Sequence, residues 1–469
     1  MPRLAHVQIN EMSALDLSTA IRAGLVGVRE ATEDALARAH ADTLGAFTHI
    51  CDERALARAD ELQHLLDDEG FTPGPLFGVP CPIKDLTQVA GLPLEGGTRV
   101  LRGNIATTDD GVVVRLRDAG TVIIGKTATP EFGLPCYTEP EGRPPASTPF
   151  DPRRGAGGSS GGAAAAVASK VVPIAHGSDG GGSIRIPAAA CGLVGLKASR
   201  GRVSKGPLGV DGPGLVSEGV LTRTVRDTAA ALDVLAKGWP GDPYFAPNPS
   251  GTFLAAADQR VQPLRVGVLT EPVITDDAEV HPGALAAVEK TAGLLAALGH
   301  EIAPAPRPFD ARAWDAFAAI WAVGSLGAPV PPEAEDQLRP LTRWLREQGR
   351  RYSGQEHAAA LIAAQQVTRQ TAALWDDFDL ILTPTLAQPP AVHGSLRDDD
   401  GPAEDCAKQT RCTPWTSIYN LTGRPAISLP LHTEIIDGVE LPFGVMLGGR
   451  LHEDALLIAV AADLEETVG

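Results

Sequence analysis

The sequence is poor in several features that would point to other classes of protein. Only 4% of its 469 residues are aromatic, and no stretch of 18 apolar residues is free of charge, so no membrane-spanning helix is predicted. The N-terminal residues lack the basic segment and apolar run of a secretion signal, and we expect a cytoplasmic protein. The six cysteines form no CxxC pair and have no histidine at metal-site spacing. We therefore predict reduced thiols and no metal.

Positive charge is also scarce. The 40 Lys and Arg residues face 58 Asp and Glu residues, which gives a formal charge of −18. A surface this acidic repels nucleic-acid phosphates and anionic lipid, so neither a nucleic acid nor a membrane is expected as a partner. Only eight of the 40 cations are lysines, which makes each lysine in an apolar setting worth examining.

Glycine and proline are abundant, with 51 and 39 residues, yet 43% of the chain is hydrophobic, as in globular proteins with many tight turns. Apolar residues at helical spacing predict a mostly helical part over residues 1–70. Over residues 75–235, short apolar runs between glycines and prolines predict buried strands, among them PLFGVPCPI, TVIIG and VVPIA. Helical patterns separate these runs, and the alternation favours an α/β sheet.

The second half of the chain predicts a variable region and then a return to the sheet. Residues 240–410 begin with a proline-rich stretch and contain the predicted strands LRVGVL and DLILTPT among long helices. Residues 411–469 resume strand patterns and end in a predicted helix. No internal repeat is evident, so we expect one large α/β domain over 1–469 with an α-rich insertion.

Two segments rich in glycine and serine carry the strongest chemical signal. They read GAGGSSGG at 155–162 and GSDGGGSIR at 177–185, separated by one predicted helix and one predicted strand. Consecutive glycines allow backbone N–H groups to converge on one anion, and aimed at a developing alkoxide such a nest is an oxyanion hole. Ser183 would lie beside those donors. The alternative is that both segments are flexible turns.

A serine nucleophile requires a base, and the sequence offers two. Lys84 follows the apolar run GVPCPI, where burial would lower the pKa of its amine until it can accept a proton. Lys84 could equally reach solvent or pair with Asp85. His176 ends the predicted strand VVPIA seven residues before Ser183, although a histidine in such a place is more often a packed core residue.

Two further motifs match known patterns only in form. Residues 120–127 satisfy the GxxxxGK[ST] spacing of a phosphate-binding loop, but their β-branched spacer belongs in a strand and Pro130 follows closely. Nucleotide binding is therefore not expected. Residues 158–162 fit GxSxG around Ser160, which would indicate a Ser-His-Asp hydrolase. That motif should follow a strand, and FDPRRGAG precedes it, so this hydrolase is kept as an alternative.

The run from Gly157 to Arg202 resembles the signature segment of the amidase signature family of serine hydrolases. Further similarity lies in GVPCPIKD, GKTATPEF, DLILTPT and YNLTGRPAISLP, which occur in the family's order. The resemblance implies the amidase signature fold, a large twisted mixed β-sheet flanked by helices. It also implies hydrolysis of a linear, aromatic or cyclic amide without any cofactor. A homodimer is the family-level expectation, and a glutaminase-type subunit of an amidotransferase assembly is the alternative function.

Residue by residue, the resemblance implies a Ser-Ser-Lys triad. Ser183 would be the nucleophile, Ser159 the bridging serine after a cis peptide, and Lys84 the terminal base. Since Lys84 must be neutral to act, we expect activity to rise toward alkaline pH. Asp179 and Arg185 would support the loop. The oxyanion donors are expected to be the backbone N–H groups of Gly180, Gly181, Gly182 and Ser183.

The sequence departs from the family pattern in two places. Residues 178–180 read Ser-Asp-Gly, where the family more often has Thr-Asp and an aliphatic residue. Residues 197–199 read Lys-Ala-Ser in place of the usual Lys-Pro-Thr. The additional glycine should make the oxyanion loop more flexible, while the three catalytic positions are intact.

Overall fold

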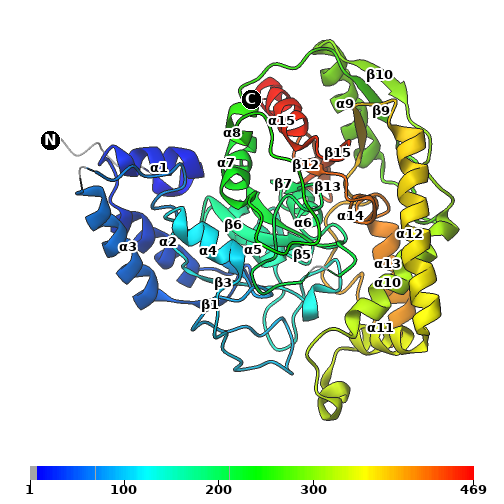
Figure 1. Cartoon of the computed structure of the whole chain (residues 1–469), viewed down its shortest axis with the longest axis horizontal. Coiled ribbons are helices and arrows are strands. Elements are labelled where there is room, and N and C mark those ends of the chain that lie inside the picture. Colours follow the sequence, from blue (N-terminus) through cyan, green and yellow to red (C-terminus); the bar gives the residue numbers. More distant parts are fainter. Residues whose placement is uncertain (1–7, 69, 211, 469) are drawn as a thin grey trace.

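A computed structural model describes residues 8–68, 70–210 and 212–468. Its centre is a mixed sheet of eight strands in the order β10-β9-β11-β15-β12-β7-β8-β6, flanked by helices (Figure 1). The strands are β6 (Ile174–Asp179), β7 (Val194–Lys197), β8 (Ser217–Thr222), β9 (Arg265–Val268), β10 (Glu301–Pro304), β11 (Leu380–Pro384), β12 (Ala426–Leu429) and β15 (Val445–Gly449). Strand β9 pairs in parallel with β10 and β11, and the other pairs are antiparallel.

Most of the sheet is buried on both faces. Every residue of β6, β7, β11, β12 and β15 is buried, whereas the edge strand β10 is partly exposed. The helices that contact these strands include α5 (Gly161–Ala168), α6 (Arg185–Ala190), α7 (Val225–Leu235), α9 (Pro282–Ala297) and α15 (Asp454–Val468). The mixed sheet flanked by helices that the sequence predicts is thus confirmed.

Helices predicted before residue 70 lie at one end of the molecule (Figure 1). They are α1 (Ala14–Arg22), α2 (Val28–His40) and α3 (Asp52–Leu66), preceded by the 3-10 turn η1 (Ile9–Glu11). A small sheet beside them pairs β1 (Phe47–Ile50), β3 (Gly125–Thr127) and β2 (Ile83–Lys84) in the order β1-β3-β2. Buried Asp227 of α7 accepts the N–H groups of Ala14 and Leu15 at 2.9 Å and so ties α1 to the central sheet.

The opposite end of the molecule is helical (Figure 1). Its elements are η3 (Ala311–Trp314), α10 (Asp315–Ser325), η4 (Pro332–Gln337), α11 (Pro340–Arg351), α12 (Gly354–Trp375) and α13 (Pro402–Cys412). Helix α12 starts in a capping box, in which Ser353 Oγ accepts the Glu356 N–H and the Glu356 carboxylate accepts the Ser353 N–H. Within the region expected to be α-rich, β9, β10 and β11 belong to the central sheet, so the helical addition begins only after residue 310.

The remaining elements are short. They are α4 (Gly111–Asp118), η2 (Glu131–Gly133), α8 (Phe253–Ala256), α14 (Ile418–Thr422), the pair β4 (Ser147–Thr148) and β5 (Asp151–Gly155), and the pair β13 (Thr433–Ile436) and β14 (Val439–Pro442).

Three predicted strands are shorter than expected or displaced. The run PLFGVPCPI at 75–83 begins as a turn, and only Ile83 of it belongs to a strand, while Pro80 forms an isolated bridge. Of the run TVIIG at 121–125, only Gly125 is in a strand, and Val122 forms an isolated bridge with Pro80. Strand β6 begins at Ile174, after Pro173, and continues to Asp179 because residues 174–179 pair throughout with β8. Pro173 lacks the N–H that a ladder needs, and β6 begins directly after it. The start of the second glycine-serine segment is therefore a strand rather than a flexible turn.

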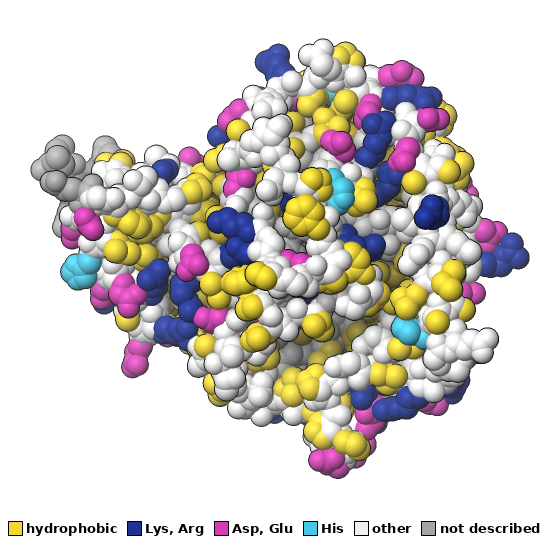
Figure 2. All heavy atoms as spheres, in the orientation of Figure 1, with side chains coloured by type: hydrophobic (Ala, Val, Ile, Leu, Met, Phe, Trp, Pro, Cys, Tyr) yellow, Lys and Arg dark blue, Asp and Glu magenta, His cyan; other side chains and the backbone are white. Residues whose placement is uncertain are grey.

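Charged side chains of both signs are interspersed over the face shown in Figure 2, so the net negative charge is not gathered into one patch there. Among the described residues, no helix combines the length and the apolar character needed to cross a bilayer.

Candidate active site

The two glycine-serine segments meet at the central sheet. Strand β6 leads into a glycine-rich loop that carries Ser183, and α6 begins two residues later. Helix α5 begins just after Ser159, which follows a cis peptide bond from Gly158. The Ser160 N–H donates to the Ser183 carbonyl oxygen at 3.1 Å and joins the two segments. Strand β2 lies against β6 and ends at Lys84.

Lys84 is fully buried and faces both segments. Its Nζ donates to Ser159 Oγ at 2.8 Å, to Ser178 Oγ at 3.1 Å and to the Ser178 carbonyl oxygen at 3.3 Å. Burial lowers the pKa of Lys84 to about 7, although Glu218 and Asp179 favour the charged form. Among the described residues, no carboxylate forms a hydrogen bond with Nζ. The neutral form of the amine is therefore populated near neutral pH.

Ser183 lies at the wall of a cavity of about 290 Å³. The residue is 8% exposed, and within the described part of the chain its Oγ has no hydrogen-bond partner. Gly181 and Ser417 line the same cavity. A hydroxyl that is unpaired and open to a cavity is free to approach a substrate carbonyl.

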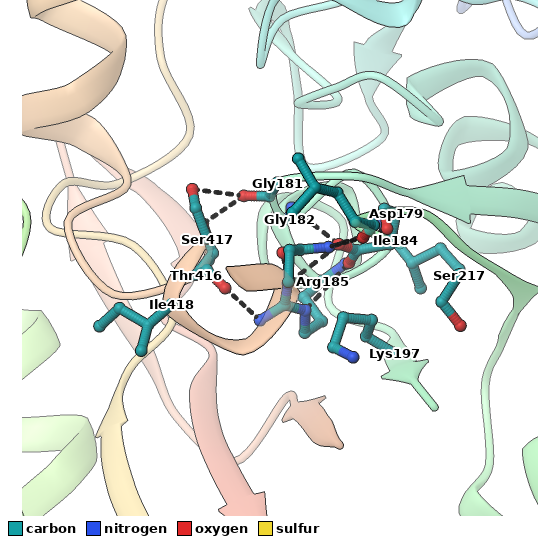
Figure 3. Close-up of polar contacts among 12 residues, drawn as sticks. Asp179, Gly181, Gly182, Ile184, Arg185, Lys197, Ser217, Thr416, Ser417 and Ile418 are labelled. Carbon is teal, nitrogen blue, oxygen red and sulfur yellow. Dashed lines mark hydrogen bonds and ion pairs between the residues drawn. The ribbon is translucent and has the colours of Figure 1, made fainter. Parts of the chain in front are cut away.

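The peptide between Gly181 and Gly182 is held at both ends (Figure 3). Thr416 Oγ1 and Ser417 Oγ donate to the Gly181 carbonyl oxygen at 2.8 and 2.9 Å. The Gly182 N–H donates to Asp179 Oδ1 at 2.8 Å. Of the four expected oxyanion donors, Gly182 is therefore already occupied. Among the described residues, the other three N–H groups, those of Gly180, Gly181 and Ser183, have no partner.

Glycine is required at position 182. Its φ of +131° is a conformation that residues with a Cβ rarely adopt. A Cβ there would lie 2.6 Å from Ile186 Cδ1 and from Thr416 Oγ1. Gly180 is also closely packed, with Val216 and Trp321 3.2 and 3.4 Å from the position of a Cβ.

Asp179 and Arg185 form a fully buried ion pair behind this loop (Figure 3). Arg185 Nε and Nη2 donate to the two carboxylate oxygens at 2.9 Å each, and Asn420 Nδ2 donates to Asp179 Oδ1 at 2.8 Å. Burial opposes ionisation of Asp179, but Arg185 and these hydrogen bonds hold its pKa well below the usual range. Arg185 Nη1 also donates to the Thr416 carbonyl oxygen at 2.7 Å, which links the loop to the segment before α14.

Four polar residues of this site were not predicted from the sequence. Ser178, Thr416, Ser417 and Asn420 donate or accept hydrogen bonds that hold Lys84, the glycine loop at 180–183 or the Asp179–Arg185 pair. Asn420 lies in YNLTGRPAISLP, one of the segments that resemble the family, but the resemblance gave it no role. Lys197 is a further buried lysine, whose pKa burial lowers to about 7 and whose Nζ donates to the Ala198 carbonyl oxygen at 2.7 Å.

The rival base has another partner. His176 lies inside β6 rather than at its end, and it is fully buried. Its Nε2 contacts Glu218 Oε2 on β8 at 3.1 Å, and no hydrogen bond between the described residues joins it to Ser183.

The rival nucleophile is also engaged. Ser160 is fully buried and its Oγ donates to the Ser178 carbonyl oxygen at 3.2 Å. A strand does precede it, contrary to expectation, because Asp151–Gly155 form β5. That strand pairs with β4 and, through an isolated bridge, with Val392, and it is not part of the central sheet, so it does not raise Ser160 to the top of that sheet, as a hydrolase elbow requires.

The phosphate-loop match has a structural explanation. Lys126 is fully buried, and its Nζ donates to Asp85 Oδ1 at 3.0 Å and to the carbonyl oxygens of Thr87 and Pro93 at 2.9 Å. Lys126 Nζ thus donates three hydrogen bonds within the protein and has none left for a phosphate group. Asp85 pairs with Lys126 and not with Lys84. Among the described residues, no group of three or more His, Cys, Asp or Glu side chains is arranged to hold a metal ion.

Comparison with known proteins agrees with this architecture. The family model Amidase matches residues 30–458. A putative amidase of Synechocystis is 36% identical over 97% of this chain and 88% of its own length. The solved structure of a 6-aminohexanoate cyclic dimer hydrolase has a TM-score of 0.90 and 31% identity, covering 99% of this chain and 98% of its own. A bacterial aryl acylamidase of the amidase signature family has a TM-score of 0.84 and 27% identity, covering 98% and 97%.

The chain therefore belongs to the amidase signature family. It has the fold of these enzymes, and it is an amide-cleaving hydrolase.

Proposed function

We propose that this enzyme hydrolyses carboxamides through an acyl-enzyme on Ser183, with Ser159 and Lys84 as a proton relay. The observation that carries the proposal is the 2.8 Å hydrogen bond between Lys84 Nζ and Ser159 Oγ inside a fully buried pocket. Burial brings the pKa of Lys84 to about 7, close to the ideal value for a general base at neutral pH.

The contacts of Lys84 fit a neutral amine. A neutral amine has two N–H bonds and one lone pair, and Lys84 Nζ has three partners. The Ser178 carbonyl oxygen can only accept, and Ser178 Oγ can accept the second N–H. Once Nζ has lost the proton that the ammonium form donates to Ser159 Oγ, its lone pair is directed at Ser159 Oγ and can accept the proton of that hydroxyl. Ser178 thus orients the base.

The first half of the reaction forms the acyl-enzyme. Ser159 passes its proton to Lys84 and takes the proton of Ser183, whose Oγ attacks the amide carbonyl carbon. The hydrogen bond from Ser183 Oγ to Ser159 Oγ is absent from the described structure and is the contact that substrate binding must complete. The N–H groups of Gly180, Gly181 and Ser183 stabilise the oxyanion, and each such donor is typically worth about 3–4 kcal/mol of barrier.

The second half releases both products. The proton on Lys84 returns through Ser159 to the leaving nitrogen, the C–N bond breaks, and ammonia or an amine departs. Water then attacks the ester carbonyl, giving its proton to the same relay, and Ser183 leaves with a proton from Ser159. The net reaction consumes one water and yields a carboxylate and an amine, so it calls for no cofactor.

Similarity supports the range of substrates. The related structures are described as acting on a cyclic dimer and on aryl acylamides, and we extend to this chain the corresponding classes of linear, aromatic or cyclic amide. The alternative of a Ser160 hydrolase is not supported, since Ser160 Oγ is buried and bonded to the backbone.

Intact-mass spectrometry after exposure to a fluorophosphonate tests the nucleophile. We expect one adduct on the wild-type protein and on Ser160→Ala, and none on Ser183→Ala, with circular dichroism confirming that both variants are folded. An adduct that persists in Ser183→Ala and disappears in Ser160→Ala would overturn the assignment.

A further inference from the structure

The cavity beside Ser183 contains no formal charge. Among the described residues, none of the side chains that line it is Asp, Glu, Lys, Arg or His, although 21% of the chain is charged. Two of the lining residues are cysteines. Burial raises the pKa of Cys406 to about 11 and that of Cys136 well above its ordinary value, so both thiols are uncharged at neutral pH. A charged group on a substrate would find no counter-ion on this wall.

Aromatic side chains are concentrated in the same wall. Trp314, Phe317 and Trp321 follow one another along η3 and α10 and line the cavity. The rings of Trp314 and Phe317 are stacked with centroids 4.3 Å apart, and those of Phe317 and Trp321 are stacked at 5.6 Å. Trp344 and Tyr352 also line the cavity. In a chain with only six tryptophans, three of them therefore contribute to one pocket.

Most polar groups on the wall are already hydrogen-bonded within the protein. The hydroxyls of Thr410, Thr413 and Ser417 each donate to a backbone carbonyl oxygen at 2.9 Å. Gln409 uses both ends of its amide, because Nε2 donates to Asp405 Oδ1 at 2.6 Å and Oε1 accepts the Cys136 N–H at 2.7 Å. These groups are held in place by the protein, and we do not expect them to form the main hydrogen bonds to a substrate.

Polar groups remain available to a substrate away from Ser183, and two of them belong to Gln348 and Tyr352. Gln348 accepts a hydrogen bond from Arg351 at 3.3 Å through Oε1, whereas its Nε2 has no partner within the described chain. The Tyr352 hydroxyl has none either, and this residue is 39% exposed and marks the open side of the cavity. Each can donate to a neutral acceptor on a substrate.

We infer that the enzyme selects uncharged amides that carry an aromatic ring on one side of the scissile bond, with the ring against the Trp314–Phe317–Trp321 stack. This inference rests on the proposed function. The cavity of about 290 Å³ is roughly twice the volume of about 150 Å³ known to bind benzene. Parallel rings already lie at stacking distances along the wall, and a substrate ring extends that arrangement.

The same wall rejects charged amides. Glutamine carries an ammonium and a carboxylate group close to its amide, and both would have to leave water without an ionic partner. The inference therefore also opposes the alternative of a glutaminase-type subunit. The charged groups lose their water when the substrate binds. This loss of binding free energy raises KM and lowers kcat/KM together.

The first test compares four amides on the wild-type enzyme. Benzamide has the ring on the acyl side, acetanilide has it on the amine side, isobutyramide has no ring, and glutamine is charged. We expect kcat/KM for at least one aromatic amide to exceed that for isobutyramide about tenfold or more, and that for glutamine at least about a hundredfold. Equal values for isobutyramide and both aromatic amides, or efficient hydrolysis of glutamine, would overturn the inference.

The second test changes the wall. Trp314→Ala should raise KM for the better aromatic amide about three- to tenfold and leave KM for isobutyramide within about twofold, and Trp314→Phe should restore most of the loss. Trp239 lies outside the cavity against Arg115, so Trp239→Phe is the matched control and should change neither value. If Trp314→Ala alters KM equally for both substrates, the stack does not recognise the ring.

Fluorophosphonate labelling separates this inference from the proposed function. Labelling of Ser183 together with the absence of any preference for aromatic amides rejects the substrate class and leaves the serine mechanism standing. An enzyme that cleaves benzamide without a labelled Ser183 rejects the mechanism instead.

Discussion

The two sides of the active-site cavity are built on different principles. On the catalytic side, buried ions and hydrogen bonds fix each group, as in the Asp179–Arg185 pair and the three contacts of Lys84. On the opposite side, α10, α11 and α13 present rings, thiols and internally bonded hydroxyls. We therefore expect the first side to determine the reactivity of the enzyme and the second side to determine which substrates it accepts. Changes on the first side should abolish the reaction, while changes on the second should redirect it.

The largest effect is expected from Lys84→Met. The substitution removes the base but keeps a side chain of similar length, and kcat should fall about 10²- to 10⁴-fold. Because Lys84 is buried without a carboxylate partner, the variant should unfold at the same or a higher temperature than the wild type. Steady-state kinetics and calorimetry check both points, and retention of wild-type kcat would exclude Lys84 as the base.

Asp179→Asn should cost the most stability. It leaves Arg185 buried without its ionic partner, and removal of one member of such a pair typically costs about 3–5 kcal/mol. The exposed pair of Asp310 and Arg312 offers the matched control, because solvent screens it and Asp310→Asn should leave the urea midpoint nearly unchanged. Urea denaturation measures both. Equal losses would show that the buried pair does not support the loop.

The pH profile sharpens the electrostatic side of the comparison. With a pKa of about 7, Lys84 is protonated at lower pH and loses the lone pair that accepts the proton. The value of kcat/KM should therefore rise about tenfold per pH unit below pH 7 and level off above it. An optimum near pH 5 would contradict this base.

A substitution at Glu218 tests the same limb of the profile. Glu218 and Asp179 favour the charged form of Lys84, and Lys205 opposes it. Glu218→Gln removes one of the two favourable charges, so the acid limb should move to lower pH. Lys205→Gln is the control of opposite sign and should move it to higher pH. Profiles that coincide with that of the wild type would show that Glu218 does not act on Lys84.

The smallest effect is expected from Ser178. Ser178→Ala removes one of the two acceptors that orient Lys84 Nζ, and a lost hydrogen bond of about 0.5–1.5 kcal/mol corresponds to a two- to tenfold lower kcat. Ser178→Thr keeps the hydroxyl and should recover most of the rate with the wild-type KM. A loss confined to KM would assign Ser178 to substrate binding.

Periodicity predicted most of the fold. Helices α9, α12 and α15 and strands β11 and β12 lie where apolar spacing indicated them. The error at 171–175 occurs at Pro173, whose missing N–H group delays the start of the ladder. Spacing also could not show that strand β9, from the middle of the chain, completes the sheet beside β11, because strand pairing depends on contacts distant in sequence.

The residues proposed for the site could be predicted where a local sequence pattern marks them. Ser159 and Ser183 belong to one continuous segment whose glycines carry a clear signal, and Lys84 stands out as a rare lysine after an apolar run. Thr416 and Asn420 reach the loop from more than 200 residues away. The aromatic stack could not be recognised either, because positions 314, 317 and 321 have the spacing of an ordinary helix face toward a core.

Thr416 and Ser417 hold the Gly181–Gly182 peptide. We therefore expect the proposed active site to be completed late in the synthesis of the chain. When residues up to 202 have left the ribosome, Lys84, Ser159 and Ser183 are all present. The hydroxyls of Thr416 and Ser417, which orient the Gly181 carbonyl, are synthesised more than 200 residues later. A nascent or truncated chain thus carries Ser183, the proposed nucleophile, without the hydroxyls that orient the Gly181 carbonyl, so the proposed mechanism predicts activity only for a chain that includes the C-terminal segment.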